Sequence, residues 1–300
     1  MNIAIIGSGG DGAGMNECLF NLCNLLKKHK IILFYHGLQG IIDNEIANID
    51  LKTIKSERKK GGIIIKSSRS SEFLTENGFN KCIKNLNKNK IDLLIIMGGN
   101  GSLKACLKLN NANVKCIFIP TTIDNDIKFS NYSIGHSTAI ENAVDFIEKV
   151  NTSMIAFDRT CIYEVMGRHC PDIALKVSKK VNACYCYTSS STKQDLLKAV
   201  KKELKNNNAP IIILQENTTD INELKSFLSL KLKTVDVKSA VVGYVQRGGF
   251  ATKEDLQMAR GFAKKTAYCV KKGLSNVLIS YDEKLKNFKC VSLEEIKGLC

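Results

Sequence analysis

Residues 91–102, Ile-Asp-Leu-Leu-Ile-Ile-Met-Gly-Gly-Asn-Gly-Ser, decide the fold. Residues 92–97, with Ile91 before them, form a nearly continuous apolar run, which is typical of a strand buried within a parallel sheet. Residues 98–102 then form a glycine-rich loop, and residues 102–109 have the pattern of a helix. The stretch therefore predicts a strand, a tight loop and a helix, which is the repeating unit of α/β proteins.

The same alternation of apolar runs and helical patterns continues on both sides of this stretch. Further strands are expected at residues 3–6, 31–34, 116–119, 153–157, 163–166, 211–214 and 240–243. Further helices are expected at residues 15–28, 172–180, 193–205, 221–232 and 254–271. Strands that alternate with helices form parallel sheets covered on both faces, so the predicted fold class is α/β.

The composition is that of an ordinary globular protein, with 300 residues of which 44% are hydrophobic and 24% charged. No apolar stretch reaches the roughly eighteen residues of a transmembrane helix, so no membrane partner is expected. Residues 1–6 lack a basic flank and run into a glycine loop, which predicts a first strand rather than a signal peptide. We therefore expect a cytoplasmic protein whose twelve cysteines are thiols.

The net charge of +15 raises nucleic acid as a partner. However, only six of the 44 basic residues are arginines, and the lysines are spread along the predicted helices and loops. Trp is absent, and aromatic residues do not interleave with the basic runs. A dispersed lysine field suits anionic small molecules, so we predict no nucleic-acid partner.

Two glycine-rich loops stand where an α/β sheet binds ligands. Residues 8–14, Ser-Gly-Gly-Asp-Gly-Ala-Gly, follow the first predicted strand, as residues 98–102 follow a later one. Glycines at such positions let backbone N–H groups approach a phosphate. One such loop is equally well explained as a tight turn, but two loops after two strands favour phosphate binding.

A third loop after a predicted strand, residues 122–126, carries two carboxylates. Asp124 could accept a proton from an alcohol, while Asp126 could help to hold a hydrated magnesium ion. An Asx turn is the structural alternative for such a loop. In a chain so rich in lysine, the arginines at positions 69, 159, 168 and 247 indicate places where a bidentate phosphate ligand is needed.

These features together resemble a known family. Its motifs appear here in order as Gly9-Gly10-Asp11 with Gly14-Met15-Asn16, Gly98-Gly99-x-Gly101-Ser102, Thr122-Ile123-Asp124-Asn125-Asp126, Glu164-Val165-Met166-Gly167-Arg168 and Gln246-Arg247-Gly248-Gly249. In order and spacing the chain resembles the bacterial-type, ATP-dependent 6-phosphofructokinases, and the resemblance covers nearly its whole length.

The resemblance implies the phosphofructokinase fold, with two Rossmann-like parallel-sheet lobes. Residues 1–135 and 247–300 would form the nucleotide-binding lobe, and residues 136–246 the sugar-phosphate-binding lobe. The implied reaction transfers the γ-phosphate of ATP, with Mg²⁺ as cofactor, to the 1-hydroxyl of fructose 6-phosphate, which gives fructose 1,6-bisphosphate. The family also implies a homotetramer.

The resemblance assigns site residues as well. Asp124 matches the general base, and Thr122 and Arg168 match groups that stabilise the transferring phosphoryl. The ATP site would comprise Gly10, Arg69, Gly99, Asn100, Gly101 and Ser102, and the metal site Asp126 and Asn100. The sugar-phosphate site would comprise Thr122, Ile123, Asp124, Arg159, Met166, Gly167, Arg168, Glu216, Lys238, Tyr244 and Arg247, of which Arg159 would serve a neighbouring subunit.

The chain departs from the family pattern at several of these positions. Asn100 stands where an Asp usually binds magnesium, Leu74 where Arg or Lys is common, and Thr121 where ATP-dependent members have Gly. Lys238 replaces an Arg and Tyr244 a His. Two alternatives therefore stay open: another donor or sugar-phosphate acceptor on the same scaffold, or a catalytically weak subunit that binds and regulates a partner.

Overall fold

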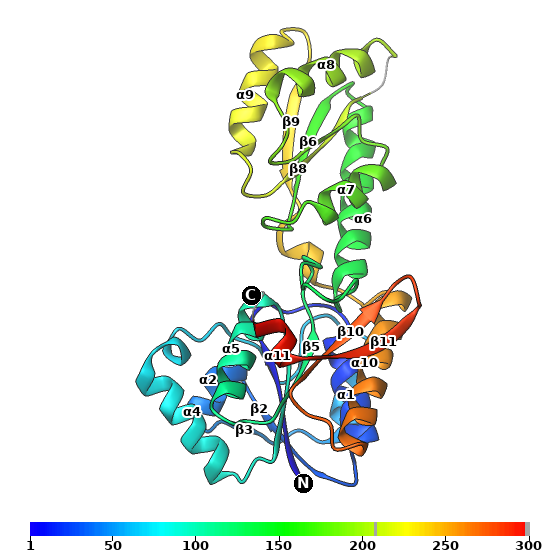
Figure 1. Cartoon of the computed structure of the whole chain (residues 1–300). Helices are drawn as coiled ribbons and strands as arrows, with labels where there is room; N and C mark the ends of the chain where they lie inside the picture. Colours follow the sequence, from blue (N-terminus) through cyan, green and yellow to red (C-terminus); the bar gives the residue numbers. More distant parts are fainter. Residues whose placement is uncertain (207–208, 298–300) are drawn as a thin grey trace. The chain divides into compact units, whose positions relative to one another are not determined.

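A computed structural model describes residues 1–206 and 209–297, and it divides the chain into two compact units (Figure 1). The first unit comprises Met1–Ser137 and Gly249–Cys300, and the second comprises Thr138–Gly248. Within the described residues, no helix is both long and apolar enough to cross a membrane.

The first unit is built on a seven-stranded sheet with the order β11-β10-β5-β4-β1-β2-β3. Its strands are β1 (Asn2–Ser8), β2 (Lys30–Phe34), β3 (Ile46–Ala47), β4 (Leu93–Gly98), β5 (Cys116–Pro120), β10 (Val277–Asp282) and β11 (Asn287–Ser292). The central strands β2, β1, β4, β5 and β10 are parallel, whereas the two edge strands β3 and β11 are antiparallel to their neighbours.

Helices cover both faces of this sheet. Successive side chains of a strand point to opposite faces, so each strand contributes to a core on either side. Ile3 and Ile5 of β1 pack into one core with α1 (Met15–Leu25) and α10 (Lys253–Lys271), on the side where α3 (Leu51–Glu57) also lies. Ala4 and Ile6 pack into a second core on the opposite face. The helices of that face are α2 (Gly37–Ile42), η1 (Glu72–Leu74), α4 (Glu76–Lys88), α5 (Asn100–Asn111) and α11 (Leu293–Lys297).

The second unit has a four-stranded, fully parallel sheet with the order β7-β8-β6-β9. Its strands are β6 (Thr160–Val165), β7 (Tyr185–Tyr187), β8 (Ile211–Gln215) and β9 (Val237–Val241). Its helices are α6 (His136–Ile155), α7 (Asp172–Lys180), α8 (Lys193–Leu204), α9 (Ile221–Lys231) and the 3-10 helix η2 (Gly243–Arg247). Helices α8 and α9 close one core against β6 and β8 through apolar side chains such as Leu196, Leu224 and Leu228.

The predicted α/β class is confirmed, but one predicted strand is wrong. Residues 153–157 were expected to be a strand, whereas Ser153–Ile155 form the last turn of α6. Buried Ala139, Ala143 and Ile147 recur at four-residue spacing along this helix. That period belongs to a helix, and it extends the element through the short apolar run that by itself resembles a strand.

Candidate functional site

Three loops of the first unit meet at one edge of its sheet. Strands β1, β4 and β5 are adjacent and parallel, so their carboxyl ends lie side by side. The loops that follow them are residues 9–14, Gly99 with the start of α5, and residues 121–126. This edge is where open α/β sheets bind ligands, and all three loops were singled out by sequence.

The loops after β1 and β4 are tied together by Ser102. Its Oγ donates a hydrogen bond to the Ser8 carbonyl at 3.0 Å and lies 2.9 Å from the Ser8 hydroxyl. A Cβ atom at Gly98 would lie 2.5 Å from the Cβ of Ser102. Glycine at position 98 is therefore required for the close approach that brings the start of α5 against the end of β1.

The amino terminus of α5 is open toward this edge. Its N-cap is Gly99, which has no side chain to satisfy the first N–H groups of the helix. A Cβ added at Gly101 would meet nothing within 4 Å. The first turn of α5 thus presents backbone donors and the positive end of its dipole to open space, an arrangement suited to phosphate.

The loop after β5 holds the predicted base in a fixed backbone. The Asp124 side chain is buried, and its backbone N–H donates to the Thr122 Oγ1 at 3.2 Å. The carbonyl of Ile123 accepts a hydrogen bond from the buried His136 ring through Nδ1 at 2.7 Å. Since a carbonyl only accepts, this contact requires the proton on Nδ1 of His136.

The two predicted metal residues are close in space. The side-chain amide of Asn100 donates to the Asp126 carbonyl at 3.4 Å, and both side chains are exposed. Within residues 1–206 and 209–297, no group of three or more His, Cys, Asp or Glu side chains is arranged to hold a metal ion. Mg²⁺ usually takes only one or two ligands from the protein and the rest from water and phosphate. The side-chain oxygens of Asn100 and Asp126 suit such a site.

The remaining predicted ATP residues border the loop after β1. The Gly9 N–H donates to the Ser68 carbonyl at 3.0 Å, and the Ser67 hydroxyl donates to the Gly9 carbonyl at 2.9 Å. These bonds join the segment that carries Arg69 to the loop that carries Gly10. The Arg69 side chain is exposed beside it.

A second cluster lies at the carboxyl edge of the sheet in the second unit, where β8, β6 and β9 are neighbours. The Glu216 carboxylate accepts hydrogen bonds from the N–H groups of Gly167 at 2.8 Å and Arg168 at 2.7 Å. The side-chain amide of Gln215 donates to the Arg168 carbonyl at 2.9 Å. Gly167 has φ +146°, a left-handed value that favours glycine and turns the chain toward Glu216.

The turn η2 completes this cluster. Gln246 is fully buried, and its side-chain carbonyl accepts from the Met166 N–H at 2.7 Å. The Arg247 Nε lies 3.5 Å from the Met166 sulfur. Tyr244, on the same turn, is 85% exposed and makes no part of this packing. The structure thus brings together five of the predicted sugar-phosphate residues, which are Met166, Gly167, Arg168, Glu216 and Arg247.

The carboxyl groups of Glu164, Glu216 and Asp220 lie near one another in this cluster. Burial, and then the carboxylates of Glu216 and Asp220, raise the pKa of Glu164 above its ordinary value. Cations stabilise a cluster that holds excess negative charge, and two of the residues gathered here, Arg168 and Arg247, are cationic.

Arg159 and Lys238 lie elsewhere in the second unit. Arg159 directly precedes β6 and Lys238 is the second residue of β9, so both stand at the amino ends of their strands. Both bind Asp236, with 2.7 Å from Arg159 Nε to Oδ2 and 3.0 Å from Lys238 Nζ to Oδ1. These contacts, Lys238 first, lower the pKa of Asp236. The structure does not bring these two cations to Glu216.

The model of the family described as phosphofructokinase matches residues 2–270 of this chain. The chain belongs to the phosphofructokinase family. A phosphofructokinase relative from Malacoplasma penetrans, named probable ATP-dependent 6-phosphofructokinase, is 34% identical over 97% of this chain and 92% of its own length. Another, from Sulfurihydrogenibium, named ATP-dependent 6-phosphofructokinase, is 34% identical over 93% of this chain and 89% of its own length.

Solved structures show that the fold is that of the phosphofructokinases. The enzyme from Pichia pastoris has a TM-score of 0.88 at 23% identity, and the match covers 98% of this chain and 35% of that one. A pyrophosphate-dependent phosphofructokinase from Marinobacter aquaeolei has a TM-score of 0.86 at 18% identity, over 98% and 83% of the two chains.

Sequence reasoning missed several residues that position the phosphofructokinase loops. Asp255, fully buried on α10, accepts from the Tyr132 hydroxyl at 2.9 Å and from the Gly135 N–H at 2.7 Å. Together with His136 it anchors the chain that follows the Asp124 loop. No local pattern marks Asp255, because its partners lie more than a hundred residues away. Gln246 was part of a recognised motif but had no assigned role. Its buried side chain accepts from the Met166 N–H and so fixes the residue that follows β6.

Proposed function

We propose that this protein is an ATP-dependent 6-phosphofructokinase, which transfers the γ-phosphoryl of ATP to the 1-hydroxyl of fructose 6-phosphate. The observation that carries the proposal is the buried Asp124, held by Thr122 in a loop that neighbours the uncapped amino terminus of α5. This pairing of a base with a phosphate cradle is what phosphoryl transfer requires. The names of the relatives support the choice of ATP and fructose 6-phosphate.

The donor assignment rests on space and charge beside α5. Gly101 leaves open space where a larger residue would restrict the donor to a smaller molecule. Thr121 is buried and carries no charge, so it supplies no cation to a bound pyrophosphate. Both features favour ATP, which enters with Gly10, Arg69 and the Gly99–Ser102 loop as its neighbours.

In the proposed reaction Asp124 accepts the proton of the sugar 1-hydroxyl as its oxygen forms a bond to the γ-phosphorus. The bond from that phosphorus to the β,γ-bridging oxygen breaks, and ADP leaves with the electron pair. Thr122 and Arg168 stabilise the charge on the transferring group. General-base catalysis of this kind typically supplies about 10²–10⁴ in rate.

Mg²⁺ is the proposed cofactor, held by Asp126 and by Asn100. Their adjacent, exposed oxygens fit an ion that binds through few protein groups. When bound, the ion would neutralise charge on the phosphates. Asn100 keeps its amide near the Asp126 backbone and contributes a dipole rather than a charge.

The sugar phosphate is proposed to bind at Met166, Gly167, Arg168, Glu216 and Arg247. Glu216 fixes the backbone of the Gly167–Arg168 turn, and the guanidinium groups of Arg168 and Arg247 suit phosphate oxygens. Tyr244 is exposed on the same turn and is proposed to contact the substrate when it binds. Arg159 and Lys238 are proposed to serve the substrate of a neighbouring copy in a cytoplasmic homotetramer.

The test is a coupled assay of the purified protein with ATP or pyrophosphate against a panel of sugar phosphates. We expect the highest kcat/KM with ATP and fructose 6-phosphate. Faster turnover with pyrophosphate, or with another acceptor, would overturn the assignment. Asn100, and Leu74 with its 75% exposure, favour a second candidate, a weak subunit that binds these ligands and regulates a partner. Tight sugar-phosphate binding without turnover would support that candidate.

A further inference from the structure

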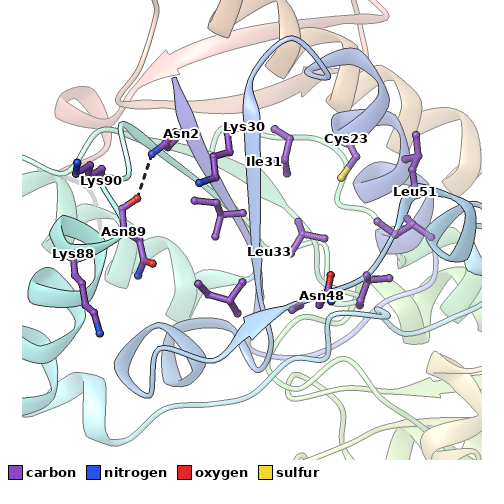
Figure 2. A pocket seen from close by; sticks show the side chains of 15 residues that line it. Asn2, Cys23, Lys30, Ile31, Leu33, Asn48, Leu51, Lys88, Asn89 and Lys90 are labelled. Atoms are coloured by element: carbon purple, nitrogen blue, oxygen red, sulfur yellow. Dashed lines mark hydrogen bonds between the residues drawn. The ribbon is translucent and has the colours of Figure 1, made fainter.

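A pocket of about 720 Å³ lies at the open edge of the large sheet, around the amino end of β2 (Figure 2). The proposed ATP loops stand at the carboxyl ends of the parallel strands β1 and β4 of the same sheet, so the pocket belongs to the opposite end of the sheet. Its lining comprises Asn2, Cys23, Lys30, Ile31, Ile32, Leu33, Ile46, Ala47, Asn48, Ile49, Leu51, Ile54, Lys88, Asn89 and Lys90. Its volume is in the range of sites that bind small molecules.

The pocket exists because the edge strand β3 is too short to cover β2. β3 pairs only with Leu33 and Phe34, and the chain then turns away to begin α3, whose N-cap is Asp50. The N–H of Lys30 donates to the Met1 carbonyl on the β1 side. Backbone groups of a strand alternate in direction, so the N–H and C=O of Ile31 point outward into the pocket. No backbone partner for them occurs in the described part of the chain.

The pocket reaches around this edge and offers different chemistry on the two faces of the sheet. Lys30, Lys88 and Lys90 lie on one side of β2, whereas Ile31 and Leu33 lie on the other (Figure 2). The lysine side also carries Asn2 and Asn89, joined by a hydrogen bond of 3.3 Å from Asn2 Nδ2 to the Asn89 carbonyl. The apolar side continues into Cys23 and Leu51 (Figure 2).

The lysine side is positively charged without internal compensation. No Asp or Glu lines the pocket. Among the described residues, the ammonium groups of Lys30, Lys88 and Lys90 form no ion pair. Lys30 on β2, with Lys88 and Lys90 from the end of α4 and the turn after it, also repels a second copy of the same edge, so a ligand with carboxylates is selected over self-association.

We propose that this edge binds an extended peptide segment of a partner protein, which adds to β2 as a strand and carries alternating acidic and aliphatic side chains. Its backbone would pair with the outward N–H and C=O of Ile31. Because side chains of an added strand alternate between faces, its carboxylates would meet the lysines while its aliphatic groups enter the side of Leu33 and Leu51. A compact ligand could use one face, but only a strand uses both faces and the open backbone.

The experiment measures fluorescence anisotropy of a labelled, end-blocked peptide, Glu-Val-Glu-Val-Glu, titrated with the full chain. We expect saturable binding that weakens at least about tenfold in the combined variant Lys30→Glu, Lys88→Glu and Lys90→Glu. The matched control is Lys201→Glu, Lys202→Glu and Lys205→Glu, which makes the same charge change on exposed residues at the end of α8 and should leave binding intact.

A second arm tests the strand itself and needs no variant of the protein. A peptide of the same sequence with N-methylated backbone amides keeps its charges but cannot pair as a strand. A block peptide, Val-Val-Glu-Glu-Glu, keeps the composition but loses the alternation. We expect both to bind at least about tenfold more weakly. Equal binding of the three peptides, or no saturable binding of the first, would overturn the proposal, and it would leave the phosphotransferase assignment untouched.

Discussion

Asp124 combines a buried carboxylate with a backbone fixed by Thr122, so its substitution tests the proposed base directly. We expect Asp124→Asn to lower kcat about 10²–10⁴-fold while the Kd for fructose 6-phosphate changes little, because the amide keeps the shape but cannot accept the proton. Steady-state assays and calorimetric titration measure the two quantities. Asp145→Asn, an exposed carboxylate paired with Lys149 on α6, is the control. Unchanged turnover in Asp124→Asn would remove this residue from the mechanism.

At Asn100, replacing the side-chain amide by a carboxylate should change the magnesium requirement. Its amide donates to the Asp126 carbonyl, whereas a carboxylate there would add a full charge beside the proposed magnesium ion. We expect Asn100→Asp to lower the magnesium concentration needed for half-maximal rate and to leave the KM for the sugar unchanged. A magnesium titration of both proteins at saturating sugar phosphate checks this. Superimposed curves would mean that the metal does not depend on position 100.

The predictable elements are those whose pattern is local. The run over residues 92–97 and the glycines after it predicted β4 and α5 because a buried parallel strand and its loop carry their own signals. The strand expected at residues 153–157 failed because five apolar-rich residues fit either period. The pair β10–β11 was not predicted, and neither was the anchoring of Gly135 by Asp255, because both depend on contacts between distant segments.

Strand β6 carries a pH dependence that follows from Glu164. Burial and the neighbouring Glu216 and Asp220 raise its pKa in the folded state, so its contribution to stability is present below the unfolded pKa of about 4.3 and is lost as the pH rises. We expect the Tm of Glu164→Gln minus that of the wild type to increase between about pH 4 and pH 7. Calorimetry over that range measures it. Glu148→Gln, exposed on α6, should show no such trend, and a flat difference for Glu164→Gln would refute the prediction.

Two free thiols, one on helix α10 and one on strand β11, lie close to each other. The Cys269 and Cys290 sulfurs lie 2.9 Å apart, and burial, followed by the neighbouring Cys290, raises the pKa of Cys269 to about 12. With a small-molecule disulfide as oxidant, the Cys290 thiolate would attack it and form a mixed disulfide, which releases one small-molecule thiol. The Cys269 thiolate would then attack the Cys290 sulfur and release the second small-molecule thiol. We expect an internal disulfide that forms faster as the pH rises and increases the Tm by about 3 °C or more.

Peptide mapping under non-reducing conditions identifies that bond. Cys290→Ser is the control, and it should show neither the linkage nor the increase in Tm. A mixed disulfide that persists on Cys290, with no link to Cys269, would contradict the expected pairing.

The arrangement of the second unit has a consequence for assembly. Arg159 and Lys238 stand at the amino ends of β6 and β9, and Met166 and Glu216 at the carboxyl ends of the same sheet. A six-residue strand such as β6 spans about 20 Å, so one sheet cannot direct both groups at one phosphate. If Arg159 and Lys238 bind substrate phosphate, they bind that of another copy, and the active form is a homo-oligomer.

Hybrids of two inactive chains test this arrangement. Arg159→Ala and Asp124→Asn should each lose most activity, yet mixing the two after dissociation should restore part of it. In a hybrid, one site receives Asp124 from one chain and Arg159 from the other. Mixing Arg159→Ala with Lys238→Ala is the matched control and should restore nothing, because both cations belong to the same donating chain and every site lacks one of them. No recovery in the mixture of Arg159→Ala with Asp124→Asn, or a fully active monomer by light scattering, would show that each chain completes its own site.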